Sequence, residues 1–315
     1  MSYLNDASSS EIMPRNKSDT RCAPGLEYIG GHCATSSVLE AMILAYNKQA
    51  TPEDQIHLNR TISTVNPHRY KKIMVRELTK RIGDKCTTHK CWTRQKFIRL
   101  MEHTAYEELS KYTHRPNSPQ GKFDWLSTFD INDAMMQYEK KYNNPETNNL
   151  KHNLFKFFGA VPMDFAKLEQ LEIATVDYPN LFDMGIRKLG IIFNLDNHDQ
   201  PGSHWVAMFT DLAMGHIFYF DSYGIIPEPR VRELMRKQIM FMRSVGIPFD
   251  RIRAEYNRTQ HQRENSECGV YSMNAIIRML RGDDFVEICK NVVPDKKINK
   301  CRLVYFDKYN KSINK

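Results

Sequence analysis

The first part of the chain has a helical pattern of hydrophobic positions. One face behind the cap candidates Thr35-Ser36-Ser37 carries Val38, Leu39, Met42, Ile43 and Tyr46. Glu40 follows Ser37 at the spacing of a capping box. Similar patterns predict helices near 70–82 and over 92–111. Residues up to about 115 are therefore predicted to be helical.

After residue 120, short runs of β-branched and aromatic residues replace this pattern. Strands are predicted at 188–195, 204–209, 216–220, 251–256 (an edge strand) and 303–306, with a hairpin turn at 211–215. Helical spacing returns at 230–245 and at 268–280, the second behind the cap candidates Asn265 and Ser266. This succession of strands and helices predicts an α+β domain.

Clusters of polar and turn-forming residues predict the boundaries of the domains. Residues 1–21 are polar and are expected to form a flexible N-terminus. The segment 114–121, rich in Pro, Asn, Ser and Gly, is the best linker candidate, and 143–153 is expected to be a surface loop. The predicted domains are therefore a helical arm, 22–115, and a core domain, 116–315.

Composition narrows the classes of protein. The 315 residues are 41% hydrophobic, which excludes a wholly disordered chain. No apolar run is long enough to span a membrane, and we expect no secretory signal because the first twenty residues lack an apolar core. The net charge of +8 favours an acidic partner, either nucleic acid or an acidic protein face. The basic runs 68–72 and 230–237 are candidates for weak nucleic-acid binding, although a solvated surface is the more common explanation.

The seven cysteines are expected to be reduced, because no secretory signal accompanies them. One alternative is a zinc site built from Cys86, His89 and Cys91 together with Cys22, His32 and Cys33. The spacing of these residues is loose. We therefore favour reduced, partly buried thiols over a metal site.

Three segments of the second half contain the parts of a cysteine nucleophile site. Cys268 begins a predicted helix, where the partial positive charge of the N-terminus stabilises a thiolate. His204 opens one predicted strand and Asp221 closes its hairpin partner, so the imidazole and the carboxylate are expected to meet. Gln262 is placed to help the Cys268 N–H bind an oxyanion; Gln260 is a rival with an unsuitable offset.

Each of these residues also has an ordinary structural explanation. A histidine on a strand is usually a structural residue, a cysteine in an apolar helix is usually part of the core, and an aspartate before Ser-Tyr-Gly usually forms a turn. The combination of all three in suitable local contexts favours the catalytic interpretation of His204, Asp221 and Cys268.

The segments HWV, FYFDSYG and SECGVYS, with the intervening glutamine, resemble the SUMO-specific and adenain-type cysteine proteases. The resemblance covers roughly 120–290, and the spacings agree with the SUMO-protease branch. It implies a papain-like core with a central mixed sheet flanked by helices. It also implies a triad of His204, Asp221 and Cys268, an oxyanion role for Gln262, and no cofactor or metal.

The segment 125–131 is similar to the Trp-Leu-Asn-Asp block that opens the catalytic domain of that family. The resemblance implies that Trp125 and Trp205 wall a narrow tunnel that admits a Gly-Gly tail. Thr128 replaces the family's Asp, which puts the contacts of that Asp in doubt. A plain core tryptophan is an equally good explanation of Trp125.

The segment from Cys22 to Asn47 looks like the N-terminal part of proteases encoded by large cytoplasmic DNA viruses. This favours a viral endopeptidase that cleaves structural polyproteins after Gly-Gly during virion maturation. Its expected location is the virion and the assembly sites in the host cytoplasm. Gly30-Gly31 would be a self-cleavage site of such an enzyme, although a simple turn is the preferred interpretation.

Three alternatives remain open at this point. The same site would serve an isopeptidase that removes SUMO or a similar modifier and works in the cytoplasm or nucleus. It would also serve an acyltransferase. The third alternative is a basic, nucleic-acid-binding structural protein with an inert protease-like fold.

Overall fold

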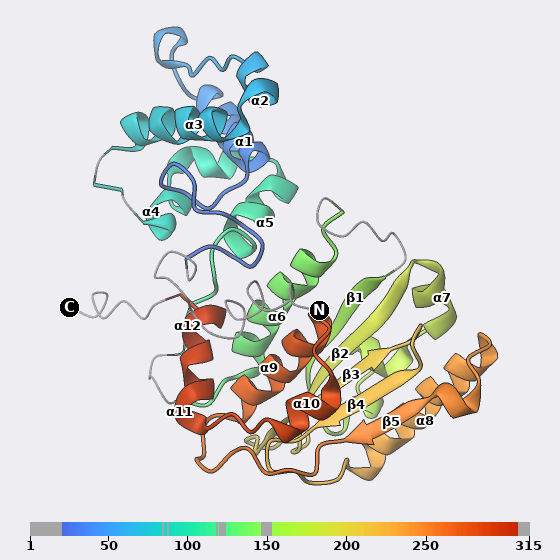
Figure 1. Cartoon of the computed structure of the whole chain (residues 1–315). Coiled ribbons are helices and arrows are strands. Elements are labelled where there is room, and N and C mark those ends of the chain that lie inside the picture. Colours follow the sequence, from blue (N-terminus) through green and yellow to red (C-terminus); the bar gives the residue numbers. More distant parts are fainter. Residues whose placement is uncertain are drawn as a thin grey trace, which may run out of the picture. The chain divides into compact units, whose positions relative to one another are not determined.

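The computed structural model describes residues 21–83, 85–86, 88–117, 119, 124–145 and 153–307 (Figure 1). These belong to two compact units. The N-terminal unit comprises Arg15–Pro116 with Tyr305–Lys308, and the C-terminal unit contains Asn117–Val304. The predicted flexible N-terminus lies outside the described residues except for Arg21, as do most of the predicted loop 143–153 and part of the predicted linker.

The N-terminal unit is helical. Its elements are α1 (Ser36–Asn47), η1 (Pro52–Asp54), α2 (Thr61–Val65), α3 (Pro67–Ile82), α4 (His89–Thr93), η2 (Lys96–Leu100) and α5 (His103–Lys111). Side chains from most of these elements form one apolar core that includes Leu39, Met42, Met74, Leu78 and Leu109.

Two predictions about these helices are wrong. Thr35 is the N-cap of α1 and accepts a hydrogen bond from the Val38 N–H, so the Ser37–Glu40 capping box does not form. The expected helix 92–111 is divided into α4, η2 and α5. The chain is extended at Gln95 and again after η2, which allows Phe97 and Ile98 to enter the core. Burial of these side chains thus outweighs the local preference for one long helix.

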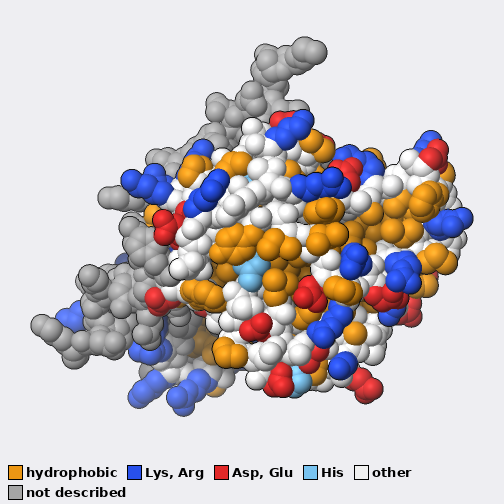
Figure 2. Space-filling view, turned by 90° about the horizontal axis from the view of Figure 1, so that it is seen from below, with side chains coloured by type: hydrophobic (Ala, Val, Ile, Leu, Met, Phe, Trp, Pro, Cys, Tyr) orange, Lys and Arg blue, Asp and Glu red, His pale blue; other side chains and the backbone are white. Residues whose placement is uncertain are grey.

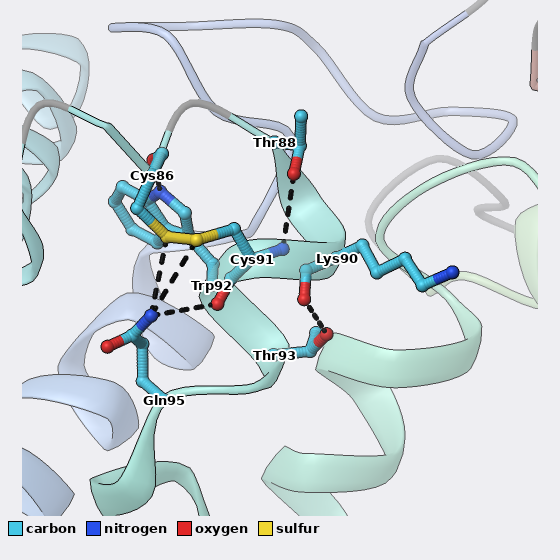
Figure 3. Close-up of a disulfide and its surroundings, with 7 residues drawn as sticks. All are labelled: Cys86, Thr88, Lys90, Cys91, Trp92, Thr93 and Gln95. Atoms are coloured by element: carbon cyan, nitrogen blue, oxygen red, sulfur yellow. Dashed lines mark hydrogen bonds between the residues drawn. A yellow bond between two sulfur atoms is a disulfide. The ribbon is translucent and has the colours of Figure 1, made fainter. Parts of the chain in front are cut away.

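The expectation that every cysteine is reduced is also wrong. Cys22 is bonded to Cys33 and Cys86 to Cys91, with Cα–Cα distances of 5.2 and 5.4 Å. The turns that bring these pairs together are not evident from cysteine spacing alone. Gln95 Nε2 faces the sulfurs of the second pair and donates to the Cys91 carbonyl oxygen (Figure 3). Paired sulfurs are not metal ligands, so the structure does not form the suggested zinc site with these cysteines.

The C-terminal unit is built on a five-stranded mixed sheet in the order β1-β2-β3-β4-β5. The strands are β1 (Leu154–Pro162), β2 (Ile186–Asn194), β3 (Trp205–Asp211), β4 (His216–Phe220) and β5 (Arg253–Tyr256). The β1–β2 and β4–β5 pairs are parallel, whereas β2–β3 and β3–β4 are antiparallel. The predicted α+β class, the β3–β4 hairpin and the edge strand β5 are confirmed.

Helices cover both faces of this sheet (Figure 1). α6 (Thr128–Tyr142) and α9 (Cys268–Leu280) lie on one face, and α7 (Tyr178–Asp183) and α8 (Pro229–Ser244) lie on the other. Side chains alternate accordingly along β3: Val206 and Met208 belong to the core beneath α8. α9 sits close to its face of the sheet, since a Cβ at Gly190 would lie 3.3 Å from Ile276.

Short helices and turns complete this unit. They are η3 (Phe165–Lys167), η4 (Glu172–Thr175), η5 (Phe249–Arg251), α10 (Phe285–Lys290), α11 (Asp295–Ile298), η6 (Asn299–Cys301) and, at the boundary of the units, α12 (Arg302–Tyr305). The predicted strand 303–306 is wrong, because α12 occupies most of it. Arg302 holds this helix by donating to the Asn299 side chain and to the Ser266 carbonyl oxygen. The predicted caps of α9 are wrong as well: Glu267 is the N-cap, with no hydrogen bond from its side chain to the helix N-terminus. Among the described residues, no helix has both the length and the apolar character needed to cross a bilayer.

Candidate active site

The β3–β4 hairpin brings His204 and Asp221 together. His204 directly precedes β3 and Asp221 directly follows β4, and Ala207 pairs with Phe220 near that end of the hairpin. His204 Nε2 lies 2.7 Å from Asp221 Oδ1, which also accepts the Tyr223 N–H at 2.9 Å. Both side chains are buried. The expected meeting of imidazole and carboxylate is therefore present.

The third residue, Cys268, is the first residue of α9. α9 is fixed against β3 by the Ser272 hydroxyl, which donates to the Trp205 carbonyl oxygen at 3.1 Å. This contact places the start of the helix, and with it Cys268, beside the start of β3. Cys268 is buried and is not part of a disulfide.

His204 carries a strongly perturbed pKa. Burial favours the neutral ring, but hydrogen bonds with Asp221 and Cys268 and the charges of both partners outweigh it and raise the pKa to about 9. The ring is thus an imidazolium at neutral pH. An imidazolium beside a thiol favours the thiolate form, which is the nucleophilic form of cysteine.

Gln262 is held by its neighbours in one orientation. The Ser222 hydroxyl donates to Oε1 at 2.7 Å, and Nε2 donates to the Glu264 carbonyl oxygen at 2.8 Å. Because a carbonyl oxygen only accepts, these contacts identify the amino end of the amide. Within the part of the chain that the structure describes, its second N–H has no partner, so it can donate to a bound oxygen. The rival Gln260 instead donates to the Gln262 carbonyl oxygen at 2.9 Å.

The two tryptophans have different environments. Trp205 is buried, and its indole N–H donates to the Leu126 carbonyl oxygen at 2.8 Å. The neighbouring Trp125 is 48% exposed, so it is not a plain core residue. Thr128 begins α6, which Ser127 and Asp130 cap through a reciprocal capping box. Asp130 thus supplies a carboxylate two positions beyond Thr128.

Apolar side chains are also exposed in this unit, among them Ile225 and Ile226 in the segment after Asp221. Figure 2 shows a face on which hydrophobic side chains surround one histidine.

Sequence reasoning missed several residues that support the site. Tyr223 stacks on the His204 ring with a centroid distance of 4.7 Å. Asn257 donates to the Asp221 carbonyl oxygen at 2.7 Å, and Ser222 accepts the Gln262 N–H at 3.0 Å through its carbonyl oxygen. Asp295 Oδ2 accepts the backbone N–H groups of Arg263 and Glu264. Tyr223 and Ser222 follow Asp221 directly in the sequence, but no local pattern marks Asn257 or Asp295.

Comparison with known proteins identifies relatives over most of the chain. The model of the Ulp1 protease family, C-terminal catalytic domain, matches residues 181–306. A putative thiol protease of Acanthamoeba polyphaga mimivirus is 35% identical over 281 residues, which are 87% of this chain and 88% of that relative. A cysteine protease of African swine fever virus is 24% identical over 266 residues, which are 75% of this chain and 89% of that relative.

The fold is shared with a solved viral protease. A crystal structure of the African swine fever virus protease in its selenomethionine form superimposes with a TM-score of 0.58 at 20% identity, covering 96% of this chain and 100% of that one. The expected type of fold, a helical N-terminal region followed by a protease core, is thereby confirmed. Together with the mimivirus relative, these matches show that the chain belongs to the Ulp1 family of cysteine proteases.

Proposed function

We propose that this cysteine protease is an endopeptidase that cleaves viral structural polyproteins after Gly-Gly, with Cys268, His204 and Asp221 as its catalytic triad. The observation that carries the proposal is the buried His204–Asp221 pair beside the free Cys268 at the start of α9. The viral origin of the full-length relatives supports the maturation role. The corresponding location is the virion and the assembly sites in the host cytoplasm.

The reaction proceeds through a thioester. The Cys268 thiolate attacks the scissile carbonyl carbon, and its electron pair forms the C–S bond while negative charge moves to the carbonyl oxygen. The Cys268 N–H and the second Nε2 hydrogen of Gln262 stabilise this oxyanion. When the C–N bond breaks, His204 gives its proton to the leaving amine. It then takes a proton from water, which hydrolyses the thioester.

Asp221 acts on the reaction through His204. Its Oδ1 accepts from Nε2 and so directs the other ring nitrogen, Nδ1, toward Cys268. Tyr223 restricts rotation of the same ring by stacking on it. Both contacts reduce the reorganisation that the ring needs between its two proton transfers.

Specificity for Gly-Gly is assigned to the walls near Cys268. Gly269 lies against Leu126 and Trp205, since a Cβ at this position would come within 3.1 Å of Leu126 and 3.3 Å of Trp205. The buried Trp205 and the half-exposed Trp125 are proposed as the walls of the tunnel. Side chains larger than hydrogen at the two residues before the cut would then be excluded.

A peptide series tests the proposal. Wild type is expected to cut a peptide with Gly-Gly before the scissile bond and to cut its Ala-Gly and Gly-Ala counterparts at least about 100-fold more slowly, because a methyl group must fit a closed tunnel. Cys268→Ala should cut none of them. Cys289→Ala is the matched control, since Cys289 is another free cysteine of the same unit. Equal cleavage of all three peptides by wild type would refute the Gly-Gly assignment.

A SUMO-deconjugating isopeptidase is the second candidate. It is favoured by a relative from African swine fever virus named SUMO-1 cysteine protease, which is 25% identical over 75% of this chain. The two functions differ in what the enzyme must bind: a folded modifier or a short extended peptide. Rapid release of a fluorophore from the C-terminus of folded SUMO, with slow cleavage of the Gly-Gly peptide, would favour the isopeptidase. The inert-protein alternative is not retained, because the chain belongs to a protease family.

A further inference from the structure

Three histidines converge in the N-terminal unit, in a cluster that the protease mechanism does not use. His32, His89 and His114 come from separate parts of the sequence, and each offers a ring nitrogen within 4.8 Å of those of the other two. The His89 and His114 rings stack with a centroid distance of 3.9 Å. We propose that these three histidines form a binding site for a divalent transition-metal ion of the zinc class.

Burial of the rings is the first argument for the site. His32 is only 4% exposed, and among the described residues no hydrogen-bond partner is found for its Nε2 or for His89 Nδ1. A buried polar nitrogen without a partner costs free energy. A metal ion bound at both nitrogens would remove that cost once the His32 proton has moved from Nε2 to Nδ1. Neutral imidazole is the commonest protein ligand for such ions.

The protonation state of the rings agrees with this chemistry. Burial is the main cause that lowers the pKa of His32 to about 3, of His89 to about 4 and of His114 to about 2. All three rings are therefore neutral at physiological pH. A neutral ring keeps one nitrogen without a proton, as a ligand requires.

The surrounding covalent framework holds the three segments in place. His32 precedes Cys33 of one disulfide, and His89 lies between Cys86 and Cys91 of the other. Cys22 forms a backbone bridge with His114. The cross-links thus act on all three segments while leaving their own sulfurs unable to bind metal.

A tryptophan extends this framework to the rings. Trp92 packs on the His32 ring with a centroid distance of 4.5 Å, and its indole N–H donates to the Cys86 carbonyl oxygen (Figure 3).

The distances between the ring nitrogens are close to those that a metal site requires. In a tetrahedral site with zinc–nitrogen bonds of about 2.0–2.1 Å, ligand nitrogens are about 3.3 Å apart. The rings therefore need to close by about 1.5 Å at most.

Two neighbouring groups, the Ala34 N–H and the Lys71 side chain, oppose binding of a metal ion. Each indicates a change that binding should cause or a variant that should alter it. The Ala34 N–H donates to His32 Nδ1 at 3.0 Å, which places the proton of the neutral ring on Nε2. A neutral ring that binds a metal through Nε2 must carry its proton on Nδ1 instead, and a protonated Nδ1 would break the contact with the Ala34 N–H. The Lys71 charge acts on both His32 and His114, so it repels a cation at the cluster. Lys71→Met is therefore expected to tighten metal binding several-fold.

Three nitrogens from histidine suit zinc, cobalt or copper better than magnesium or calcium, which prefer oxygen. Three protein ligands also leave one coordination position for water or another donor. We therefore use Co²⁺ as the spectroscopic probe and Zn²⁺ as its competitor.

The test is a titration of the full chain with Co²⁺, after treatment with a chelator and with the disulfides intact. We expect one Co²⁺ per chain with the visible absorption of a tetrahedral nitrogen site, displaced by stoichiometric Zn²⁺. His89→Ala should weaken binding by more than about 100-fold, because loss of an outer partner alone typically costs 10- to 100-fold. His68→Ala and His103→Ala are matched controls, since both histidines are exposed in the same unit, and they should bind as wild type does.

Folding of the variants is followed by thermal unfolding and by circular dichroism. If His89→Ala unfolds the unit, wild type decides the matter through the NMR signals of its histidine rings on addition of Zn²⁺. Selective shifts of three ring signals would support the site. No stoichiometric binding to wild type, no change in those signals, or binding unaffected in folded His89→Ala would each overturn it.

Discussion

Both units of this protein contain buried histidines and cysteines, but the protonation of the histidines and the pairing of the cysteines differ between the units. In the C-terminal unit, a buried histidine lies beside a carboxylate and a free thiol, and its pKa is raised to about 9. In the N-terminal unit, burial lowers the pKa of His32, His89 and His114 to between about 2 and 4. Four cysteines there are paired, whereas Cys268 is free.

This comparison shows that the charged partner, and not burial, decides the state of a buried histidine. Burial opposes the charged form of all four rings. Among these four rings, only the His204 ring, beside Asp221 and Cys268, has a pKa that is raised in spite of burial. This ring therefore carries a proton at neutral pH. The cluster in the N-terminal unit has no such carboxylate among the causes of its pKa shifts, and its rings stay neutral. A neutral ring suits ligation and a charged ring suits acid catalysis.

Removal of the proposed nucleophile, Cys268, is expected to separate the two classes of cysteine most strongly. Cys268→Ala is expected to lower kcat on a cleavable peptide by at least about 10,000-fold, because the covalent route is lost. Cys289→Ala should stay within about two-fold of wild type. Comparable losses in the two variants, with both proteins folded, would show that Cys268 is not the nucleophile.

The carboxylate that distinguishes His204 from the other histidines is the second target. Asp221→Asn should reduce kcat by roughly 1,000-fold, since the ring loses its orientation and its charge partner. In wild type, kcat/KM should fall as the pH rises through about 9, where His204 loses its proton. In Asp221→Asn this alkaline limb should move to lower pH. An unmoved limb would assign it to another group.

The same pKa has a consequence for stability. Since the folded-state value of about 9 exceeds the ordinary value of 6.5, protonation of His204 stabilises the fold fully below pH 6.5. This contribution is lost as the pH rises through about 9. Thermal unfolding of the C-terminal unit should accordingly be more sensitive to pH between 7 and 10 in wild type than in His204→Gln.

Crowding at Gly269, beside the proposed nucleophile Cys268, is expected to have a smaller effect on activity. A Cβ at Gly269 would lie 3.1 Å from Leu126 and 3.3 Å from Trp205, so Gly269→Ala must displace one of them by a few tenths of an ångström. We expect kcat/KM to fall about ten-fold and the free energy of unfolding to fall by about 1–2 kcal/mol. Alanine normally stabilises a helix relative to glycine by about 1 kcal/mol, so a more stable variant would argue against this crowding.

The sequence predicted the C-terminal unit better than the N-terminal one for a physical reason. The strands β2, β3 and β4 are nearly continuous apolar runs, and α9 begins at Cys268 as expected, because burial on the sheet imposes a strong pattern. β1 was not predicted. Its buried and partly exposed residues do not alternate regularly, so the strand lacks a clear two-residue pattern. In the N-terminal unit, one apolar pattern over 92–111 concealed three short elements, since core contacts and a disulfide determine where the chain turns.

The residues of the candidate site also differ in whether the sequence could predict them. His204, Asp221 and Cys268 each stand at the end of an element, so their meeting followed from the hairpin and the helix start. Asn257 and Asp295 were not predictable, because they act through hydrogen bonds to backbone atoms far away in the sequence. Backbone partners leave no signature in residue type or spacing. The disulfides, and the meeting of His114 with His32 and His89, depend instead on how the chain turns, which the spacing of cysteines and histidines does not reveal.

Loss of a disulfide should lower the stability of the N-terminal unit without affecting the C-terminal unit. The double variant Cys22→Ser/Cys33→Ser should lower the stability of that unit by about 2–3 kcal/mol, because the unfolded chain gains the freedom of an open loop. That corresponds to a fall in Tm of about 10 °C or more for a domain of this size. The C-terminal unit should be unaffected, and reductant should leave its Cys268 active. An unchanged Tm for the N-terminal unit would mean that this disulfide does not stabilise it.

Nucleic-acid binding is the weakest effect expected, and it would show which unit carries the basic surface. Exposed Arg69 and Lys72 lie on α3, and exposed Arg232 and Arg236 lie on α8. Since phosphate contacts release counterions, any retention on a DNA column should decrease steeply with salt and be weak near physiological ionic strength, with a Kd of about 100 μM. Charge reversal of the α3 pair should abolish retention if α3 contacts DNA. Charge reversal of the α8 pair should do so if α8 makes the contact. Equal, negligible retention of wild type and both variants at low salt would mean that the net charge of +8 is a solvated surface and that both units present their cations to water.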